Sequence, residues 1–288
     1  MKTGNAQNEL RVCFIAYVDI LGYRERIQKC KNDYSALKRE LDDFKLKILD
    51  HQILLIHSIE ASGGMISFFS DSVIIHIPIP SDTPESFDDG RPYICSPIED
   101  LAMYQFDLAI KNIFIRGGAS VNYGYLDNSI AFGPGLIDAV ECEEAADYPR
   151  ICLTEWAMSP IRDYIDNQWP GDERIIKFVI CGEDGKFFIN YLYTIVDYIE
   201  ETCDSIPDDG KEYPLYRNVP DAIDLMRKHK NNIETNLEKE KETGPKIKNK
   251  FIWLANYHNY FCKRHFKDLN DLIISNYHEN FYSISSKE

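Results

Sequence analysis

The sequence predicts an α+β fold in which the elements follow the order β-α-β-β-α-β, with a helical extension at the C-terminal end. Two observations carry this prediction. Residues 12–18 (VCFIAYV) form a near-continuous apolar run, which is typical of a strand buried on both faces. Two further short apolar segments, 65–69 and 73–77, flank Ser70-Asp71-Ser72, a spacing that favours a β-hairpin with a tight turn.

The remaining elements of this order follow from periodicity. Between residues 34 and 57, apolar side chains recur at three-, four- and seven-residue steps, which predicts a helix between the first strand and the hairpin. Residues 78–97 hold five prolines and several acids and are expected to form a surface loop. A second helix at about 98–112 and a strand at 114–123 complete the β-α-β-β-α-β order, which is ferredoxin-like.

The second half of the chain is predicted more coarsely. A hairpin arm at 125–132 precedes a helix that runs to about Asp147, and later strands are expected at 150–153, 175–180 and 187–189. Ile206-Pro207-Asp208-Asp209-Gly210 has the composition of a linker. Two helices, near 217–241 and 246–265, are expected after it. We therefore predict one domain over residues 8–205 and a helical extension over 211–288 that packs on it.

Charge limits the classes of partner. The 288 residues carry 32 Lys+Arg against 47 Asp+Glu, a net charge of −15, which argues against a duplex DNA binder and against broad contact with anionic membranes. No stretch approaches 18 uninterrupted apolar residues and the N-terminus lacks an apolar signal core, so we expect a cytoplasmic protein. Residues 226–267 carry a local +7, which indicates a solvated helix face or a surface that docks on the acidic body; nucleic-acid contact is the alternative.

Cysteine and histidine spacing offers no metal signature. The eight cysteines form no CxxC pair and have no histidine at zinc spacing, so reduced thiols are expected, with neither disulfides nor zinc. No Walker, dinucleotide-binding or nucleophile-elbow motif occurs.

Two aspartates stand out. Asp19 ends the first apolar strand, where a carboxylate needs a cation or strong donors unless it is the N-cap of the next helix. Asp71 lies at the predicted hairpin tip, where a plain turn residue is the alternative. In the expected sheet the first strand neighbours this hairpin, so the two carboxylates can converge. Two converging carboxylates repel each other unless they share a proton or hold a hard divalent cation.

The chain resembles the class III nucleotide cyclase domain over about residues 10–155. Four segments carry the resemblance: Phe14–Tyr23, the Phe69-Ser70-Asp71-Ser72 turn, Arg116-Gly117-Gly118-Ala119 and Phe132–Ala139. It implies that Asp19, Asp71 and the backbone carbonyl of Ile20 bind two Mg²⁺ or Mn²⁺ ions. It also implies metal-assisted attack of a ribose 3′-oxygen on the α-phosphorus, and a homodimer with sites at its interface. Arg116 is a candidate triphosphate contact, or else forms a structural ion pair with Glu141.

Four positions depart from that family. The base-reading Lys of the purine cyclases falls on Ser67 and its partner acid or Thr on Ile130, while the transition-state Asn and Arg fall on Ile137 and Glu141. This combination resembles the pyrimidine cyclases of the bacterial anti-phage system called Pycsar. Supporting segments are Tyr148–Ile151, residues 184–192 and the Phe251–Tyr260 stretch. The resemblance implies cyclic UMP or cyclic CMP made from UTP or CTP and read by a separate effector protein. An adenylate or guanylate cyclase, or an inactive cyclase fold that senses nucleotides or dimerises, are the alternatives.

Overall fold

The predicted first strand is the centre of the sheet. In the computed structural model, which describes residues 9–84, 91–127, 129–163, 165, 174–202, 220–239, 245–275, 277 and 282–283, β1 spans Arg11–Ile20. It pairs antiparallel with β3 (Ser72–Pro78) on one side and with β4 (Ile115–Leu126) on the other. Val12 to Ala16 are at most 2% exposed, which confirms a strand buried on both faces.

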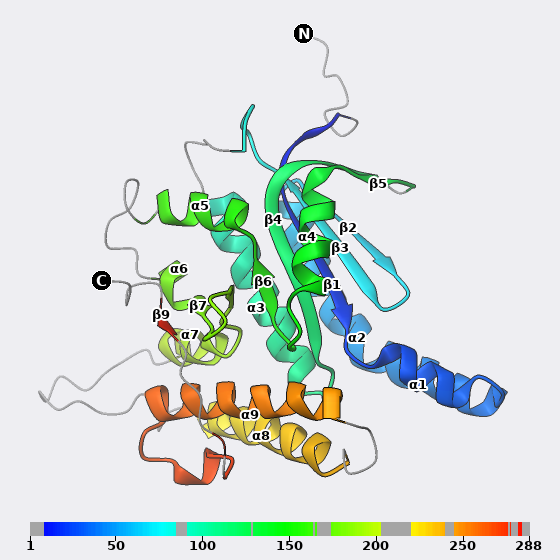
Figure 1. The fold of residues 1–288 in the computed structure, drawn as a ribbon, viewed down its shortest axis with the longest axis vertical. Helices are drawn as coiled ribbons and strands as arrows, with labels where there is room; N and C mark the ends of the chain where they lie inside the picture. The colour runs from blue at the N-terminus through cyan, green and yellow to red at the C-terminus, as the bar shows by residue number, and fades with distance from the viewer. Residues whose placement is uncertain are drawn as a thin grey trace, which may run out of the picture.

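The β-α-β-β-α-β order is confirmed. The first four strands lie in the order β2-β3-β1-β4, with β2 (Met65–Phe69) at the edge, and each neighbouring pair is antiparallel. Helices α1 (Tyr23–Cys30) and α2 (Tyr34–Ala61) connect β1 to β2, and α3 (Ser96–Ala109) connects β3 to β4 (Figure 1). This is the split β-α-β arrangement, in which a third strand is inserted between two parallel ones.

The sheet continues beyond β4. Strand β4 pairs parallel with β6 (Ile151–Leu153), and the order then runs through β8 (Phe187–Ile189) and β7 (Val179–Cys181) to β9 (Tyr282–Ser283). The short β5 (Ala131–Phe132) pairs with the end of β4 and forms the predicted hairpin arm. Because β9 pairs with β7, the C-terminal region contributes a strand to the main sheet.

Alternation along β1 divides the core into two layers. Val12, Phe14, Ala16 and Val18 belong to the main core, which also contains residues of α2 and α3. Cys13 and Ile15 belong to a smaller cluster with Ala139 of α4 (Pro134–Glu144). Since successive side chains of a strand point to opposite faces, odd-numbered residues of β1, Asp19 included, lie on the face that α4 covers.

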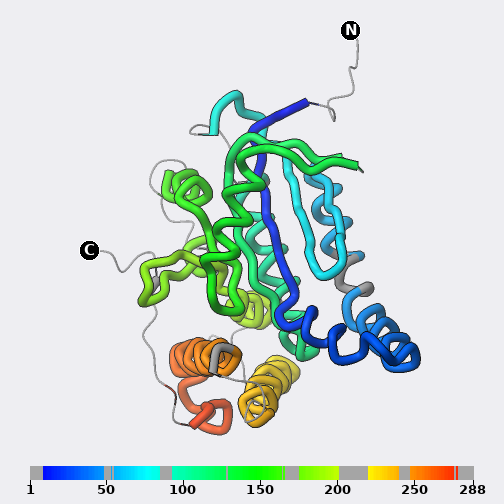
Figure 2. Tube along the Cα trace, turned by 45° about the vertical axis from the view of Figure 1, so that its right-hand side comes forward, coloured from blue at the N-terminus to red at the C-terminus, as the bar shows by residue number. Residues whose placement is uncertain are grey.

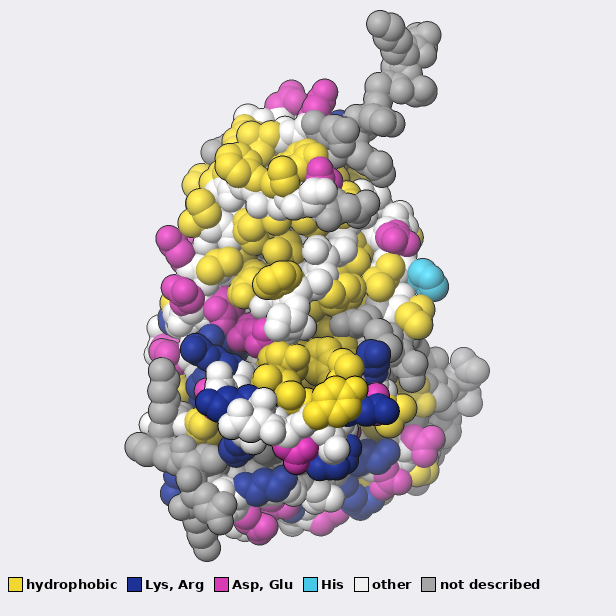
Figure 3. Space-filling model, turned by 90° about the vertical axis from the view of Figure 1, so that its right-hand side faces the viewer, with side chains coloured by type: hydrophobic (Ala, Val, Ile, Leu, Met, Phe, Trp, Pro, Cys, Tyr) yellow, Lys and Arg dark blue, Asp and Glu magenta, His cyan; other side chains and the backbone are white. Residues whose placement is uncertain are grey.

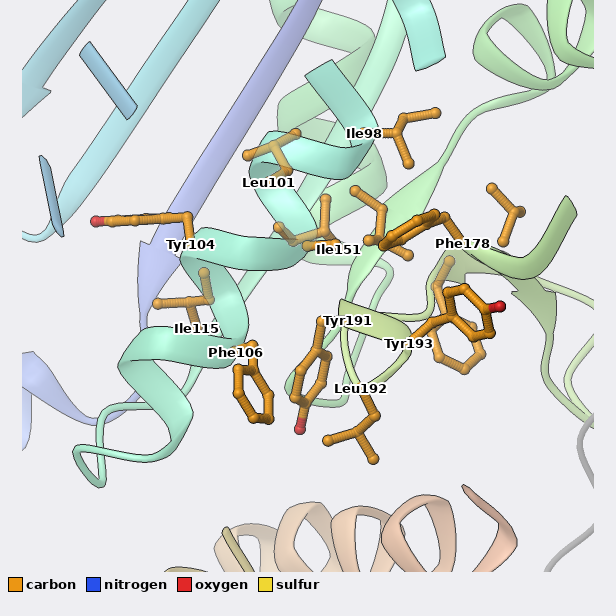
Figure 4. Close-up of a cluster of buried hydrophobic side chains, with 14 of the residues drawn as sticks. Ile98, Leu101, Tyr104, Phe106, Ile115, Ile151, Phe178, Tyr191, Leu192 and Tyr193 are labelled. Atoms are coloured by element: carbon orange, nitrogen blue, oxygen red, sulfur yellow. The ribbon is translucent and has the colours of Figure 1, made fainter. Parts of the chain in front are cut away.

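Aromatic and aliphatic side chains fill the space between α3, the sheet and the segment after β8. Figure 4 shows Phe106 of α3 beside Tyr191, which follows β8, and Ile115 of β4 beside Tyr104 of α3. Tyr191 is 1% exposed and Leu192 fully buried. Helix α7 (Tyr193–Thr202) begins directly after this pair.

The C-terminal helices are present and pack against this core. Helices α8 (Pro220–Lys239) and α9 (Pro245–His265) lie side by side below the sheet (Figure 2). Phe251 of α9 contacts Phe114 edge-on with ring centroids 5.4 Å apart, and Trp253 stacks on Tyr148 at 5.3 Å. A 3₁₀ turn, η4 (Asn270–Leu272), follows α9. Within the described residues, no helix is long and apolar enough to cross a membrane.

Several predicted bounds were wrong. Residues 174–177 form helix α6 rather than the start of a strand, and Arg91–Cys95 is a π-helical turn inside the predicted loop. Helices α1, α5 (Glu155–Asp163) and α7 were not predicted. The proposed linker over 206–210 lies outside the described residues.

Candidate functional site

The hairpin tip meets the end of the first strand. Asp19 is paired with Ser72 in the β1–β3 register, and Asp71 directly precedes Ser72. The backbone N–H of Ile20 donates a hydrogen bond of 3.1 Å to the carbonyl of Asp71. Ser70 takes a φ of 57°, a left-handed conformation that allows the two-residue turn. The convergence of the two aspartates expected from the sequence is therefore present.

Asp19 is half-buried and weakly neutralised. Its side chain is 23% exposed, the Arg116 Nη2 atom lies 3.9 Å from its Oδ2, and the Ser72 hydroxyl lies 3.5 Å from its Oδ1. Burial, and next the charge of Asp71, raise the pKa of the Asp19 carboxyl from 3.8 to about 6. The carboxylate thus has a shortage of positive charge around it.

The alternative role of Asp19 as a helix N-cap is wrong. Asp19 is a residue of β1, and the N-cap of α1 is Gly22, which has a φ of 77° and makes no side-chain cap hydrogen bond. Asp71 lies in the hairpin turn, as expected if it is a plain turn residue. Its position beside Asp19 is equally compatible with a carboxylate that binds a cation.

Arg116 is held by an acid that sequence analysis missed. Its Nε atom forms an ion pair with Glu143 of α4, whose side chain is only 5% exposed, and Glu141 is exposed. Burial raises the pKa of Glu143, and the Arg116 guanidinium partly opposes that shift. The spacing of Gly135, Ala139 and Glu143 is the signal, because residues four apart share one helix face and this face is buried against the sheet.

Asp19, Arg116 and Glu143 thus form a short row on the α4 side of the sheet. We call these three residues, together with Asp71, the β1-end site. Arg116 is 26% exposed and lies between the two carboxylates that it contacts. Lys250 of α9 adds a further positive charge that acts on Glu143. The basic C-terminal block therefore contributes charge close to this site.

The donor set suits a hard divalent cation. Asp19, Asp71 and the Ile20 backbone carbonyl offer oxygen ligands only, which Mg²⁺ and Mn²⁺ prefer. The raised pKa of Asp19 is the observation that fits, because a bound cation relieves the repulsion between the two carboxylates. No cluster of three or more His, Cys, Asp or Glu side chains with metal-binding geometry occurs among the described residues.

Of the four positions named above as departing from the purine-cyclase pattern, three are small or apolar and the fourth, Glu141, is an exposed acid. Ser67 is half-buried in β2 opposite Ile74, and Ile130 and Ile137 are 58% and 59% exposed. Phe69, at the hairpin turn, is 76% exposed. Figure 3 shows hydrophobic side chains gathered over the face that carries the β2–β3 hairpin and β5, with Lys and Arg concentrated in its lower part.

Comparisons with known proteins find similar solved structures but no matching family model and no matching curated sequence. Among solved structures, the adenylyl cyclase CyaB from P. aeruginosa is similar at 13% identity and a TM-score of 0.43, covering 63% of this chain and 95% of the other.

Two further structures are similar. The guanylyl cyclase domain of the RhoGC fusion protein from the aquatic fungus Blastocladiella emersonii matches at 12% identity and a TM-score of 0.38, covering 64% of this chain and 96% of that one. The adenylate/guanylate cyclase/hydrolase from Silicibacter pomeroyi matches at 18% identity and a TM-score of 0.37, covering 55% and 84%.

Proposed function

We propose that this protein is a pyrimidine nucleotide cyclase that converts UTP or CTP to the 3′,5′-cyclic nucleotide and pyrophosphate. The observation that carries the proposal is the convergence of Asp19 and Asp71, fixed by the hydrogen bond from the Ile20 N–H to the Asp71 carbonyl. The β-α-β-β-α-β order and the sequence motifs that resemble class III cyclases support it further.

The reaction is one displacement at phosphorus. A bond forms between the ribose 3′-oxygen and the α-phosphorus, the bond from that phosphorus to the β-phosphate oxygen breaks, and the 3′-hydroxyl proton goes to solvent. Two Mg²⁺ or Mn²⁺ ions bound by Asp19, Asp71 and the Ile20 carbonyl would supply positive charge for the triphosphate and for the ribose oxygen. Arg116 adds a positive charge at the same end of the strands, and its guanidinium is also paired with Glu143.

The pyrimidine preference is supported by residues at the base-reading positions. Ser67 and Ile130 stand where purine cyclases carry a Lys and an acid or Thr. A side chain lacking those groups leaves the hydrogen-bonding edge of a purine unpaired, which costs binding free energy. The exposed apolar side chains, among them Phe69 and Phe132, support a homodimer with sites at its interface. In this proposal the enzyme works in the cytoplasm and its product activates a separate effector protein in phage defence.

The test is product identification. The purified protein is incubated with each of the four nucleoside triphosphates and Mn²⁺, and products are identified by mass spectrometry. Cyclic UMP or cyclic CMP supports the proposal, and cyclic AMP or cyclic GMP contradicts the pyrimidine assignment. Absence of product, with nucleotide binding retained, indicates an inactive cyclase fold.

The two-aspartate assignment has its own control. Asp71→Asn keeps the shape of the turn residue and removes its charge, and we expect activity to fall at least about 100-fold, as for loss of one charged ligand at a reacting centre. Asp82→Asn, on an exposed residue after β3, is the matched control and should keep full activity. Full activity in Asp71→Asn would refute the metal-binding role of Asp71.

A further inference from the structure

A cavity lies toward the opposite end of the same strands. It has a volume of about 300 Å³ and is lined by Arg11, Met65, His76, Tyr93, Tyr125 and Leu126, among others. Arg11 lies eight residues before Asp19 on β1, and His76 is paired with Ile15, four residues before Asp19, so at the rise of an extended strand these two cavity residues lie roughly 26 Å and roughly 13 Å from Asp19. The cavity is therefore separate from the site to which the proposed activity is assigned.

His76 is the unexplained group in this cavity. His76 is only 7% exposed, and among the residues that the structure describes neither of its ring nitrogens has a hydrogen-bond partner. The backbone carbonyls of Gly124 and of His76 itself lie near the ring, but outside hydrogen-bond geometry. Burial lowers the pKa of His76, so the ring is neutral at pH 7 and offers one N–H donor and one acceptor. Buried polar groups without a partner are uncommon, and each calls for an occupant.

The other walls indicate the chemistry of that occupant. Tyr93 and Tyr125 provide flat aromatic surface, and Met65, Ile79 and Leu126 provide apolar surface. The Arg11 side chain is 33% exposed, and its one ion pair among the described residues, at 3.7 Å, is with Glu9, whose side chain is 77% exposed. A solvent-exposed pair of this kind contributes little free energy, so the Arg11 guanidinium can exchange it for another carboxylate. The volume lies at the lower end of the range for small-molecule sites, which favours a small ligand.

We propose that this cavity binds a small aromatic monocarboxylate, with the ring between the apolar and tyrosine walls, the carboxylate on Arg11, and a hydrogen bond from His76. A carboxylate accepts the N–H of His76 and pairs with the guanidinium of Arg11, so one group satisfies both side chains. The proposal is independent of the nucleotide cyclase proposal because its site and its readout are separate.

The test uses benzoate and indole-3-carboxylate as probes, with benzamide and indole-3-carboxamide as uncharged counterparts. The full chain is labelled with ¹⁵N-histidine and the ring signals are followed by NMR during titration. We expect the His76 ring signals to move with the carboxylates, and Arg11→Gln to weaken carboxylate binding at least about tenfold, as expected for losing a hydrogen bond to a charged group. Binding of the carboxamides should be unchanged by Arg11→Gln.

Matched variants assign the signal. His76→Phe removes the ring nitrogens at similar size, and the same change at the exposed His57 is its control. Met65→Trp adds bulk to the cavity wall and leaves His76 in place, and should abolish the shifts; thermal melting shows that each variant is folded. Wild-type His76 signals that no probe moves would overturn the proposal, since water alone then satisfies the ring. Equal binding of carboxylates and carboxamides would overturn the assignment of an anionic ligand.

Discussion

Replacing Asp19 by Asn should stabilise the protein at neutral and alkaline pH in the absence of divalent cations. The folded protein raises the pKa of Asp19 from 3.8 to about 6, so the ionised carboxylate is less favourable in the folded state than in the unfolded one. Between about pH 4 and pH 6 the folded state binds more protons, and the free energy of unfolding therefore falls as pH rises through that window. Asn removes the charge and keeps the shape.

The magnitude follows from the shift. The rise in the pKa of Asp19 from 3.8 to about 6 corresponds to a loss of roughly 3 kcal/mol in the free energy of unfolding when the carboxylate is ionised, since each pKa unit is worth about 1.36 kcal/mol. Partial exposure of Asp19 and its contacts with Arg116 and Ser72 reduce this, since solvent screens the charge and the two donors favour ionisation. We expect a gain of about 1–2 kcal/mol at pH 8, or about 2–8 °C in melting temperature for a chain of this size.

The assay is thermal and urea unfolding at pH 3.5 and pH 8, with and without Mn²⁺. At pH 3.5, below the pKa of 3.8 of the unfolded state, the wild type and Asp19→Asn should differ little, and at pH 8 the variant should be more stable without metal. Mn²⁺ should stabilise the wild type and not the variant if the Asp19 carboxylate binds the cation as proposed above. Asp42→Asn, at an exposed position of α2, serves as the control. A less stable Asp19→Asn at pH 8 would refute the reasoning and indicate that the ion pair with Arg116 dominates.

Three further predictions concern the framework of the site. Gly118→Ala should destabilise the protein by at least about 2 kcal/mol in urea unfolding, because the added Cβ would lie 2.1 Å from the carbonyl of Ala139. Arg150→Met should cost about 1–2 kcal/mol in the same measurement, because Asp184 loses the fully buried guanidinium to which it is paired, while its own side chain is 36% exposed and stays partly solvated; an unchanged urea midpoint would contradict this. Burial lowers the pKa of His258 to about 4, so the wild type should lose stability as pH falls from 6.5 to 4; His258→Leu should flatten that profile.

The sequence predicts best the elements with long regular patterns. Strand β1 and helix α2 have enough residues for the period to be unambiguous, and both were located within a few residues of their observed ends. Helix α6 has only four residues, and its two isoleucines read equally well as strand. Helix α5 contains Pro160, which disfavours a helix by local rules and is present here inside a nine-residue helix whose Ala157, Met158 and Ile161 are buried.

The residues of the β1-end site also divide into those that the sequence reveals and those that it does not. Asp19 and Asp71 were found because a carboxylate next to a buried apolar run is an anomaly in the sequence itself. The sequence does not identify the ion-pair partner of Arg116, because the choice between Glu141 and Glu143 depends on the rotation of α4 against the sheet. That rotation is set by packing: the Cβ that an alanine would add at Gly118 lies close to the carbonyl of Ala139 and the backbone N–H of Glu143. Single-sequence reasoning has no access to that contact.

The two edges of the sheet differ in how readily they accept another chain. At one edge, β9 covers β7 with the two-residue strand Tyr282–Ser283, and so short an edge offers little for an incoming strand to pair with. At the other edge, β2 presents five residues, including the exposed Phe69. Strand addition by a foreign peptide, and aggregation during purification, should therefore begin at β2. A charged substitution at Phe68 would be the first change to make for solubility.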